Sequence, residues 1–316
     1  DLTQAAAITS TSGDVGLIAV GSLDQASDGD VTTGGDVLLE SGVDWMMAGD
    51  TVVTAGGNVV GQALGGDIEL GVIRGTNVAL MASDNILDAN AGSLNVAADN
   101  LSLRADNGLI GNHDNASLTP DLNINAIDLD VAVLAAHSDS GIYLSEADGL
   151  TVTSVSEVVV DIESLVRVNF NSTTDDVSVD RNAAVLEDLR TTTDGPIKLV
   201  SESGVLTIEG GSDAQGLSAA GSGDVLLEAR GADGDLIINA DVVSDTGNIT
   251  LDAGNDLALN ASVTTGGLGS VYLVAVNDMT LADSVTSVSG DILVDAGLDL
   301  TQAAAITSTS GDVGLI

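Results

Sequence analysis

The chain has 316 residues, 44% of them hydrophobic, which is enough for one or two domains with a sizeable core. It carries 48 acidic and seven basic residues, and the formal net charge of −41 excludes nucleic acid and anionic membrane surfaces as favourable partners. The absence of cysteine excludes disulfides and thiolate metal sites, and no apolar run approaches the ~18 residues that a membrane-spanning helix needs.

The two ends of the sequence are identical. The first eighteen residues, DLTQAAAITSTSGDVGLI, recur letter for letter as residues 299–316, which gives a period of 298 residues. An identity of this length indicates a tandem repeat. We therefore expect 1–316 to be one continuous window of a longer array, with 1–298 as one superrepeat and 299–316 as the start of the next copy.

A shorter period lies inside the long one. A Gly followed by a short polar residue and an aliphatic residue recurs at intervals of 21 to 24 residues. These steps begin at Gly13, Gly35, Gly57, Gly223, Gly247, Gly269, Gly290 and Gly311. The spacing predicts about thirteen coils of about 22–23 residues in each 298-residue superrepeat.

Each coil is predicted to contain three short strands, because aliphatic residues alternate in three groups after the Gly. In one coil these groups are Val37 and Leu39, then Trp45 and Met47, then Val52. The scheme repeats over 249–263 and 271–285. Gly, Asn and Asp between the strands are expected to supply the positive φ angles of tight corners, and the Ala-rich QAAAI runs are expected to form narrow corners.

One such coil cannot fold alone, because its few inward aliphatic side chains do not offset the cost of ordering some 22 residues. If each strand pairs in parallel with the same strand of the next coil, at about 4.8 Å, the backbone is hydrogen-bonded and the aliphatic columns become continuous. The sequence therefore predicts an all-β parallel β-helix, or β-solenoid, that advances on the order of 60 Å per superrepeat.

The coils are less regular over about 98–222. Residues 107–120 are expected to form a loop at a corner, and 157–190 combine acidic residues with Arg167, Arg181 and Arg190. The segment 181–190, RNAAVLEDLR, is expected to form a decorated corner, a short helix or a lateral contact patch. These decorated coils hold whatever is specific to this chain.

The sequence GNITLDAGNDLALNASVTTGG (247–267) and the last 27 residues, from Gly290, resemble the haemagglutinin-type repeats of giant bacterial surface proteins, such as filamentous haemagglutinin and related large exoproteins. The resemblance covers about two thirds of the chain. It implies a right-handed parallel β-helix, secretion through an outer-membrane partner, and a role in adhesion, matrix or filaments at the bacterial cell surface.

Aspartates are predicted to form a column. Asp235, Asp256, Asp278 and Asp299 occupy equivalent positions in successive coils, with Asp44 two coils further on. Carboxylates about 4.8 Å apart repel each other, and two arrangements relieve this repulsion: the side chains splay apart or accept backbone N–H bonds at the corners, or Ca²⁺ bridges adjacent coils. We expect that no cofactor is required, and Ca²⁺ stays open as a ligand.

We predict no catalytic, cofactor-binding or metal-binding residues and no enzymatic activity. His113 beside Asp114 and His137 beside Ser138 suggest a hydrolase, but no nucleophile elbow or metal-ligand spacing accompanies either histidine. A polysaccharide-cleaving β-helix is disfavoured because aromatic and basic residues are scarce. The Gly266–Gly269 run precedes a strand rather than a helix, which disfavours phosphate binding.

Among the Asn-x-Ser/Thr triplets, those at Asn115 and Asn171 lie in loop-like stretches where glycosylation is compatible with the fold, whereas those at Asn248 and Asn260 lie in predicted coils with stacked neighbours. The function we predict is that of an extracellular structural fibre or stalk whose main partner is itself, through axial continuation and lateral association. The alternative is an adhesin or glycan-binding surface protein that presents residues 98–222 to a ligand not identified by the sequence.

Overall fold

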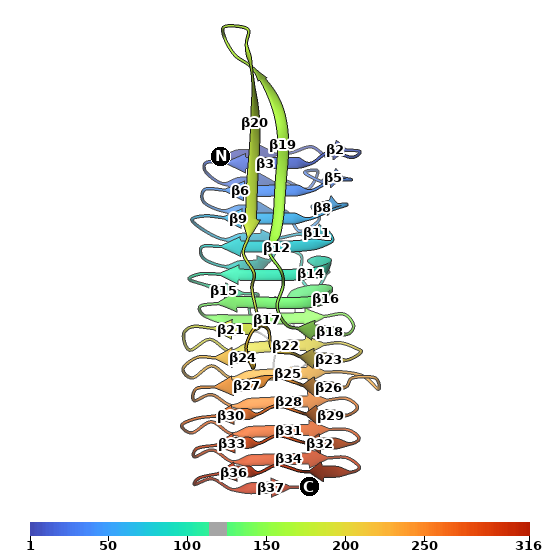
Figure 1. The fold of residues 1–316 in the computed structure, drawn as a ribbon, viewed down its shortest axis with the longest axis vertical. Coiled ribbons are helices and arrows are strands. Elements are labelled where there is room, and N and C mark those ends of the chain that lie inside the picture. Colours follow the sequence, from blue (N-terminus) through green and yellow to red (C-terminus); the bar gives the residue numbers. More distant parts are fainter. Residues whose placement is uncertain (114–124) are drawn as a thin grey trace.

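The computed structural model describes residues 1–113 and 125–316. The regular secondary structure of these residues consists of β-strands alone. Thirty-five strands form one sheet that winds about fourteen times around a straight shaft, and two form a separate hairpin (Figure 1). The predicted all-β parallel β-solenoid is therefore confirmed. The number of turns, about fourteen, agrees with the thirteen coils predicted for 1–298 together with the one coil formed by 299–316.

The coils nearest the N-terminus each contain one longer and two shorter strands. The longer strands are β3 (Val15–Ala19), β6 (Val37–Ser41), β9 (Val59–Ala63) and β12 (Asn77–Ala82). The next strands in each coil are β1 (Leu2–Gln4), β4 (Leu23–Gln25), β7 (Trp45–Met47), β10 (Ile68–Leu70), β13 (Ile86–Asp88) and β15 (Leu109–Ile110). The third strands are β2 (Ile8–Ser10), β5 (Val31–Thr33), β8 (Val52–Ala55) and β11 (Val72–Arg74).

The middle of the shaft contains β14 (Val96–Ala105), β16 (Ile127–Ser138), β17 (Gly141–Glu146) and β18 (Leu150–Val152). The first part of β14 pairs with β11 and the rest with β12, so one long strand spans two strand positions of the preceding coils. The hairpin, β19 (Val158–Val168) and β20 (Thr174–Ala183), leaves the shaft after β18. It is antiparallel, unlike the ladders of the shaft.

The C-terminal coils again contain three strands each. The first strands are β22 (Ile197–Ser201), β25 (Val225–Ala229), β28 (Ile249–Ala253), β31 (Val271–Ala275), β34 (Ile292–Ala296) and β37 (Val313–Leu315). The second are β23 (Leu206–Ile208), β26 (Leu236–Ile238), β29 (Leu257–Leu259), β32 (Met279–Leu281) and β35 (Leu300–Gln302). The third are β21 (Leu189–Thr191), β24 (Gln215–Ala219), β27 (Asp241–Ser244), β30 (Val263–Thr265), β33 (Val285–Ser287) and β36 (Ile306–Ser308).

The register follows the predicted short period. Val37 pairs with Val15 on one side and with Val59 on the other, so the residues after successive Gly-Asp or Gly-Asn steps stack directly. The first two predicted strands of this coil are confirmed. The third is displaced by one residue, because Val53 and not Val52 is the buried residue that pairs with Val31.

The positive φ angles predicted for Gly, Asn and Asp at the corners occur at some of these residues, such as Gly231, Gly267 and Asp188, but at none of the eight glycines of the repeated step. Instead, a Cβ on Gly247 would collide with the carbonyl oxygen of Gly223 in the preceding coil. Glycine is required here because two backbones pass close to each other.

The core is one aliphatic cluster that runs along the inside of the shaft. Its only aromatic member is Trp45, which is fully buried. The Trp45 indole Nε1–H donates to Gln25 Oε1 at 2.8 Å, and Gln25 Nε2 donates to Gln4 Oε1 at 2.8 Å. The indole N–H is therefore satisfied by Gln25 of the preceding coil, and Gln25 is in turn held by Gln4 one coil further.

Two expectations for the irregular region are corrected. The predicted loop over 107–120 is wrong at its start, because Leu109 and Ile110 form β15 within the shaft; residues 114–120 lie outside the described part of the chain. The helix considered for 181–190 is also wrong. Residues 181–183 end β20, Leu186 bridges to Val155, and β21 begins at Leu189, so the segment returns the chain from the hairpin to the shaft.

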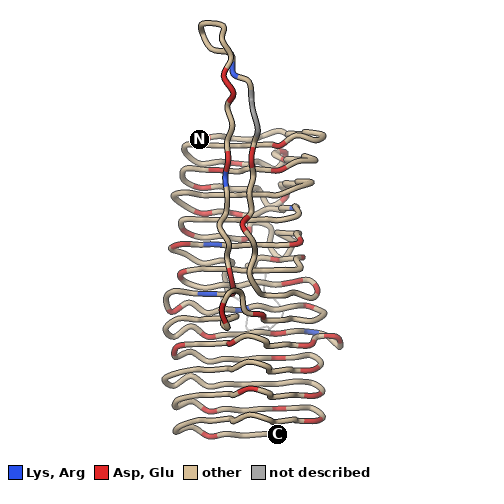
Figure 2. Tube along the Cα trace, viewed as in Figure 1, with Lys and Arg blue, Asp and Glu red and all other residues tan. Residues whose placement is uncertain are grey.

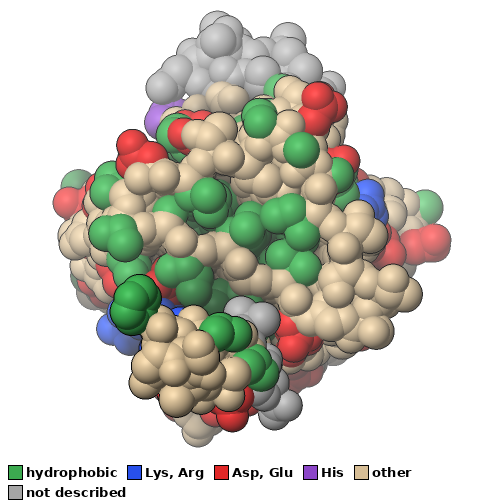
Figure 3. Space-filling view, turned by 90° about the horizontal axis from the view of Figure 1, so that it is seen from above, with side chains coloured by type: hydrophobic (Ala, Val, Ile, Leu, Met, Phe, Trp, Pro, Cys, Tyr) green, Lys and Arg blue, Asp and Glu red, His purple; other side chains and the backbone are tan. Residues whose placement is uncertain are grey.

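Acidic residues occur along the whole length of the shaft, whereas the few Lys and Arg residues are scattered (Figure 2). At the N-terminal end, seen from above, hydrophobic side chains fill the middle of the cross-section (Figure 3). Leu2, Ile8 and Leu17 of the first coil are only partly buried, and Leu315 of the last coil is 46% exposed. The described residues contain no helix that is long and apolar enough to cross a membrane.

Candidate functional site

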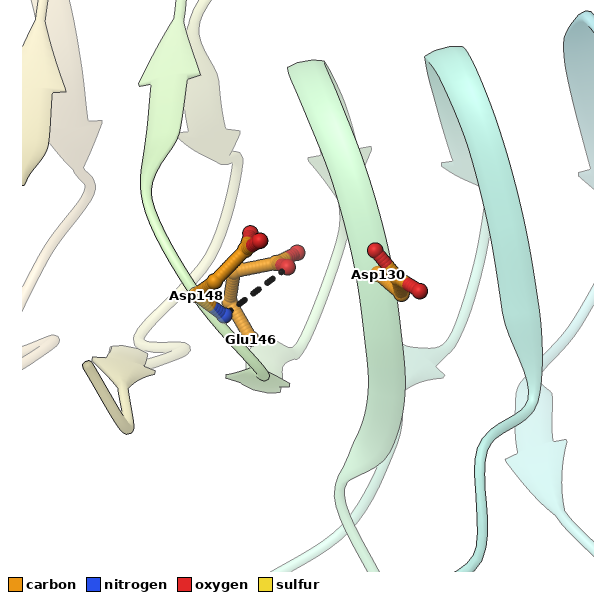
Figure 4. A group of neighbouring side chains, drawn as sticks. All are labelled: Asp130, Glu146 and Asp148. Atoms are coloured by element: carbon orange, nitrogen blue, oxygen red, sulfur yellow. Dashed lines mark hydrogen bonds between the residues drawn. The ribbon is translucent and has the colours of Figure 1, made fainter. Parts of the chain in front are cut away.

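Three carboxylates gather where β16 and β17 adjoin in the middle of the shaft (Figure 4). Asp130 belongs to β16, Glu146 ends β17, and Asp148 follows two residues later. Each offers one oxygen, and these oxygens lie within 4.8 Å of one another. Asp130 and Asp148 are exposed, but Glu146 is fully buried.

Backbone N–H groups hold the Glu146 carboxylate in place. Val131 donates to both carboxylate oxygens, at 3.2 and 3.3 Å, and Ala147 donates to Oε1 at 3.1 Å. Burial raises the pKa of Glu146 to about 7, and the neighbouring Asp148 carboxylate adds to the rise, while the N–H bonds oppose it. Near neutral pH this group is therefore partly protonated.

This arrangement can accommodate positive charge in two ways. A divalent cation such as Ca²⁺ accepts carboxylate oxygens, and Asp130, Glu146 and Asp148 are the residues that could hold it. Alternatively, a proton on Glu146 removes one of the three charges. Both outcomes follow from the same fact, that three carboxylates share one small volume.

Our sequence analysis did not single out Glu146, although the sequence holds a signal for it. Glu146 pairs with Ser201, which in turn pairs with Ala229, and the following coil has Ala253 at the same place. A carboxylate therefore replaces a small residue at an inward position of the shaft. Only the register of the coils reveals this substitution, since the local sequence SEAD resembles many other acidic stretches of the chain.

The predicted aspartate column is confirmed, because Leu236, Leu257, Met279 and Leu300, which follow the four aspartates, pair in successive coils. The carboxylates accept backbone N–H bonds along the column. Asp278 N donates to Asp256 Oδ1 at 3.0 Å, and Asp299 N donates to Asp278 Oδ1 at 3.2 Å. Asp44 accepts in the same way from Asp67 N, at 3.1 Å.

A second polar column lies at the Gly-Asp-Val steps. Asp36 N donates to Asp14 Oδ1 at 2.8 Å, and Asp312 N donates to Asp291 Oδ1 at 2.8 Å. Inside the shaft, the Ser244 hydroxyl donates to Gly223 O at 2.8 Å and accepts from Gly247 N at 2.9 Å. The recurrence of Asp, Asn, Ser and Thr at the corners is thus explained by hydrogen bonds between coils.

The two histidines are not arranged as hydrolase partners in the described part of the chain. Ser138 points inward and its hydroxyl donates to Gly141 O at 2.8 Å, whereas His137, on the opposite face of β16, contacts Glu187 O through Nε2 at 2.6 Å. Burial lowers the pKa of His137. His113 stacks on Tyr143 with ring centroids 5.6 Å apart, and Asp114 lies outside the described residues.

A hollow of about 300 Å³ lies beside His137 and is lined by residues of the segment that returns from the hairpin, Glu187 to Arg190, and of β24. Asp188 has a positive φ of 65°, and burial raises its pKa to about 6. The nearby Asp213 carboxylate adds to this rise. The hollow is therefore mostly polar and places a partly buried carboxyl group, with a raised pKa, near an imidazole whose pKa is lowered.

Of the glycosylation triplets, Asn171 lies exposed in the turn of the hairpin, where its Oδ1 accepts from Thr173 N at 3.1 Å. Asn248 and Asn260 belong to the polar columns: Asn248 Nδ2 donates to Asp224, and Asn260 Nδ2 donates to Asn239. Asn115 lies outside the described residues. Asn171, Asn248 and Asn260 are all exposed, but of these three Asn171 lies outside the polar columns.

The hairpin was not predicted from the sequence. Its lower half packs on the outer face of the shaft, where Val158, Val160 and Ala183 contact Leu38, Val60 and Ala79 in a second apolar cluster. Arg181 forms an ion pair with Glu40 of β6. Arg181 thus ties the hairpin to the shaft of the same chain, and the lateral contact patch considered for 181–190 stays a prediction.

Comparisons with protein-family models, with curated proteins and with solved structures gave no match.

Proposed function

We propose that this chain is a unit of an extracellular structural fibre, in which superrepeats stack end to end and span distance at a bacterial surface or in a matrix. One observation carries the proposal. Residues 1–18 and 299–316 are identical in sequence and form the same three strands, β1 to β3 and β35 to β37, at opposite ends of the shaft. The last coil therefore exposes the same residues with which the first coil pairs to the second coil.

The packing at the first coil supports this continuation. Leu2 pairs with Leu23, Ile8 with Val31 and Val15 with Val37. A second copy joined after residue 298 would place residues equivalent to Leu23, Val31 and Val37 on Leu300, Ile306 and Val313. The backbone edge and apolar cross-section of the last coil would then be covered, as inside the shaft.

The acidic exterior and the haemagglutinin-like repeats support a place outside the cell. A net charge of −41 keeps neighbouring fibres apart, and cations or a partner would be needed to join them laterally. No chemical step is required for this function. Its mechanical basis is the continuous parallel ladder together with the aliphatic columns inside it.

The test is a protein in which 1–298 is joined directly to 1–316. We expect electron microscopy to show a single straight rod about twice as long as the rod of 1–316, without a gap or bend at the junction. Two separate particles joined by a flexible point would contradict the proposal.

A second candidate function is an adhesin or glycan-binding protein. The observation in its favour is that the projecting hairpin and the hollow beside His137 both come from residues within 98–222. A glycan array probed with 1–316 separates the two functions. Selective, saturable binding that is lost when the hairpin is removed favours the adhesin, and an array without binding favours the passive fibre.

A further inference from the structure

The hairpin is longer than the face on which it lies. It leaves the shaft beside β18, runs toward the N-terminal end over β12, β9, β6 and β3, and continues past the first coil (Figure 1). Ile162 marks the last coil that it covers, because its Cδ1 occupies the space where a Cβ of Gly16 would lie. The part of the hairpin beyond Ile162 and Val179 therefore has no coil of this chain beneath it.

The covered part shows what this face of the hairpin binds. Alternate residues of β20 face the shaft: Ala183 is buried, and Arg181 and Val179 are partly buried. Beneath them Leu38, Val60 and Ala79, which point outward from the shaft, are completely buried. The hairpin thus covers a column of outward apolar residues, one in each coil.

The same column can be followed into a preceding copy. Leu38 pairs with Gly16, and Gly16 is the counterpart of Gly314 in the 18-residue repeat. Gly314 pairs with Leu293, and Leu293 pairs with Tyr272. In a tandem array the two coils above Gly16 therefore present Leu293 and Tyr272 of the preceding copy at the positions where this copy presents Leu38 and Val60.

These two residues are apolar and uncovered in the single chain. Tyr272 is 37% exposed and Leu293 is partly exposed, in contrast to the fully buried Leu38 and Val60. The column then becomes polar, with Thr250 in the coil beyond Tyr272. An outward apolar pair thus lies where the free part of the hairpin of the following copy would reach.

The distances agree. A strand rises about 3.3 Å per residue, and adjacent coils are about 4.8 Å apart. Val177 is the next residue of the same face of β20 toward the turn of the hairpin. It lies about 7 Å beyond Val179, which corresponds to one to two coils past Gly16 in the direction of the preceding copy. The turn carries Phe170, whose side chain is completely exposed, several coils higher still.

We propose that the β19–β20 hairpin is a clasp between superrepeats, which lies across the junction and covers Leu293 and Tyr272 of the preceding copy. The inference rests on the proposed end-to-end stacking and adds a partner surface to it. Each junction would then be held by the ladder between two coils and also by the hairpin, which is anchored on the three coils that follow Gly16, at Leu38, Val60 and Ala79.

The test uses the tandem protein in which 1–298 is joined to 1–316. Because the sequence contains no cysteine, two introduced cysteines can form only the intended disulfide within one molecule. Leu293→Cys in the first copy is combined with Val177→Cys in the second copy. We expect oxidation to convert most of the protein to a disulfide-linked form, seen as altered mobility on a non-reducing gel. The positive control is Leu38→Cys with Val160→Cys in one copy, and the negative control is Leu293→Cys with Val177→Cys in the same copy.

A second measurement does not depend on disulfide geometry. Maleimide labelling of Leu293→Cys in the first copy should be at least tenfold slower than in a matched tandem protein whose second copy has residues 158–183 replaced by a short Gly-Ser turn. Equal labelling rates and no cross-link, in a tandem protein that microscopy shows as one continuous rod, would overturn the clasp and leave the fibre intact. Two disconnected particles would overturn the fibre, and the clasp with it.

Discussion

Arg181 and Glu40 lie 141 residues apart in the sequence, but their side chains form an ion pair between the hairpin and the shaft, in which Nη2 of Arg181 donates to Oε1 of Glu40 at 3.0 Å. Glu40 is nearly buried beneath the hairpin, whereas the Arg181 side chain is 37% exposed. The pair closes one side of the contact between β20 and β6.

Replacing Arg181 with Ala should loosen the hairpin, because it leaves the Glu40 carboxylate without its cationic partner. We expect a loss of about 1 kcal/mol in the docking of the hairpin and little change in the shaft. Limited proteolysis within 163–175 measures this opening. Arg181→Lys, which keeps the charge but not the two-nitrogen contact, should be cleaved at an intermediate rate. If Arg181→Ala were cleaved as slowly as the natural chain, this would contradict the role given to the ion pair.

Gly247→Ala should destabilise the shaft by about 1–3 kcal/mol, because its Cβ would collide with the Gly223 carbonyl oxygen. Gly13 is the matched control. It occupies the same step of the first coil, and a Cβ there would meet only the Ser10 Oγ, at 3.4 Å. Urea unfolding followed by circular dichroism should show a lower midpoint for Gly247→Ala than for the natural chain, and almost no change for Gly13→Ala. Equal midpoints for the two variants would refute the stacking explanation.

Ser244→Ala should cost about 1–3 kcal/mol, because the Gly223 carbonyl and the Gly247 N–H lose a buried partner. Thermal unfolding is the appropriate measurement. Ser154→Ala, at an exposed serine of the same shaft, serves as the control and should leave the melting temperature unchanged. A Ser244→Ala protein that melts with this control would show that the hydroxyl contributes nothing to coil stacking.

Stability should fall as the pH rises through the range set by Glu146. Its folded pKa of about 7 lies above the ordinary value of 4.5, so the folded state holds a proton that the unfolded state releases. Stability is therefore fullest below about pH 4.5, declines up to about pH 7 and then levels off, with a loss on the order of 3 kcal/mol. Asp128 and Asp188, each with a pKa of about 6, act in the same direction at lower pH.

Between pH 6 and 7.5 Glu146 lowers stability as the pH rises, whereas His137, whose pKa is lowered by burial, acts in the opposite direction. Urea unfolding of Glu146→Gln should therefore show no loss of stability there, whereas the natural chain loses stability. Asp148→Asn keeps the buried carboxyl and removes a nearby negative charge, so its decline should move to lower pH. A decline in Glu146→Gln equal to that of the natural chain would exclude Glu146 as its source.

Removal of Ca²⁺ should leave the melting temperature unchanged, because backbone N–H groups already satisfy an oxygen in the aspartate column. Melting curves with a chelator and with added CaCl₂ measure this. A rise in the melting temperature that needs Ca²⁺ and disappears in Asp148→Asn would instead assign a cation to Asp130, Glu146 and Asp148.

The sequence was sufficient to predict the shaft, because its signal is local and repeated. Each Gly-Asp-Val step specifies a close backbone approach, a polar contact between corners and an inward aliphatic residue, and the same residues recur in the next coil. Val37 illustrates this, since its partners Val15 and Val59 follow the same step.

The hairpin could not be predicted in the same way. Its strand VVVDIESLVRV alternates with period two, as the shaft strands do, so the pattern does not show whether it stacks in parallel or folds back. Its anchors, Leu38 and Glu40, lie more than a hundred residues away in the sequence. The acidic group around Glu146 was hidden for a related reason, because only the three-dimensional register places Asp130 beside it.

The single tryptophan also gives the molecule an intrinsic optical label. Trp45 is buried among the coils near the N-terminus, and its indole is tied to Gln25. Its emission should therefore respond to the opening of those coils alone, while circular dichroism averages over the entire chain. The separation between the two transitions would measure how far unfolding travels along the rod before it stops, which defines the length of its cooperative unit.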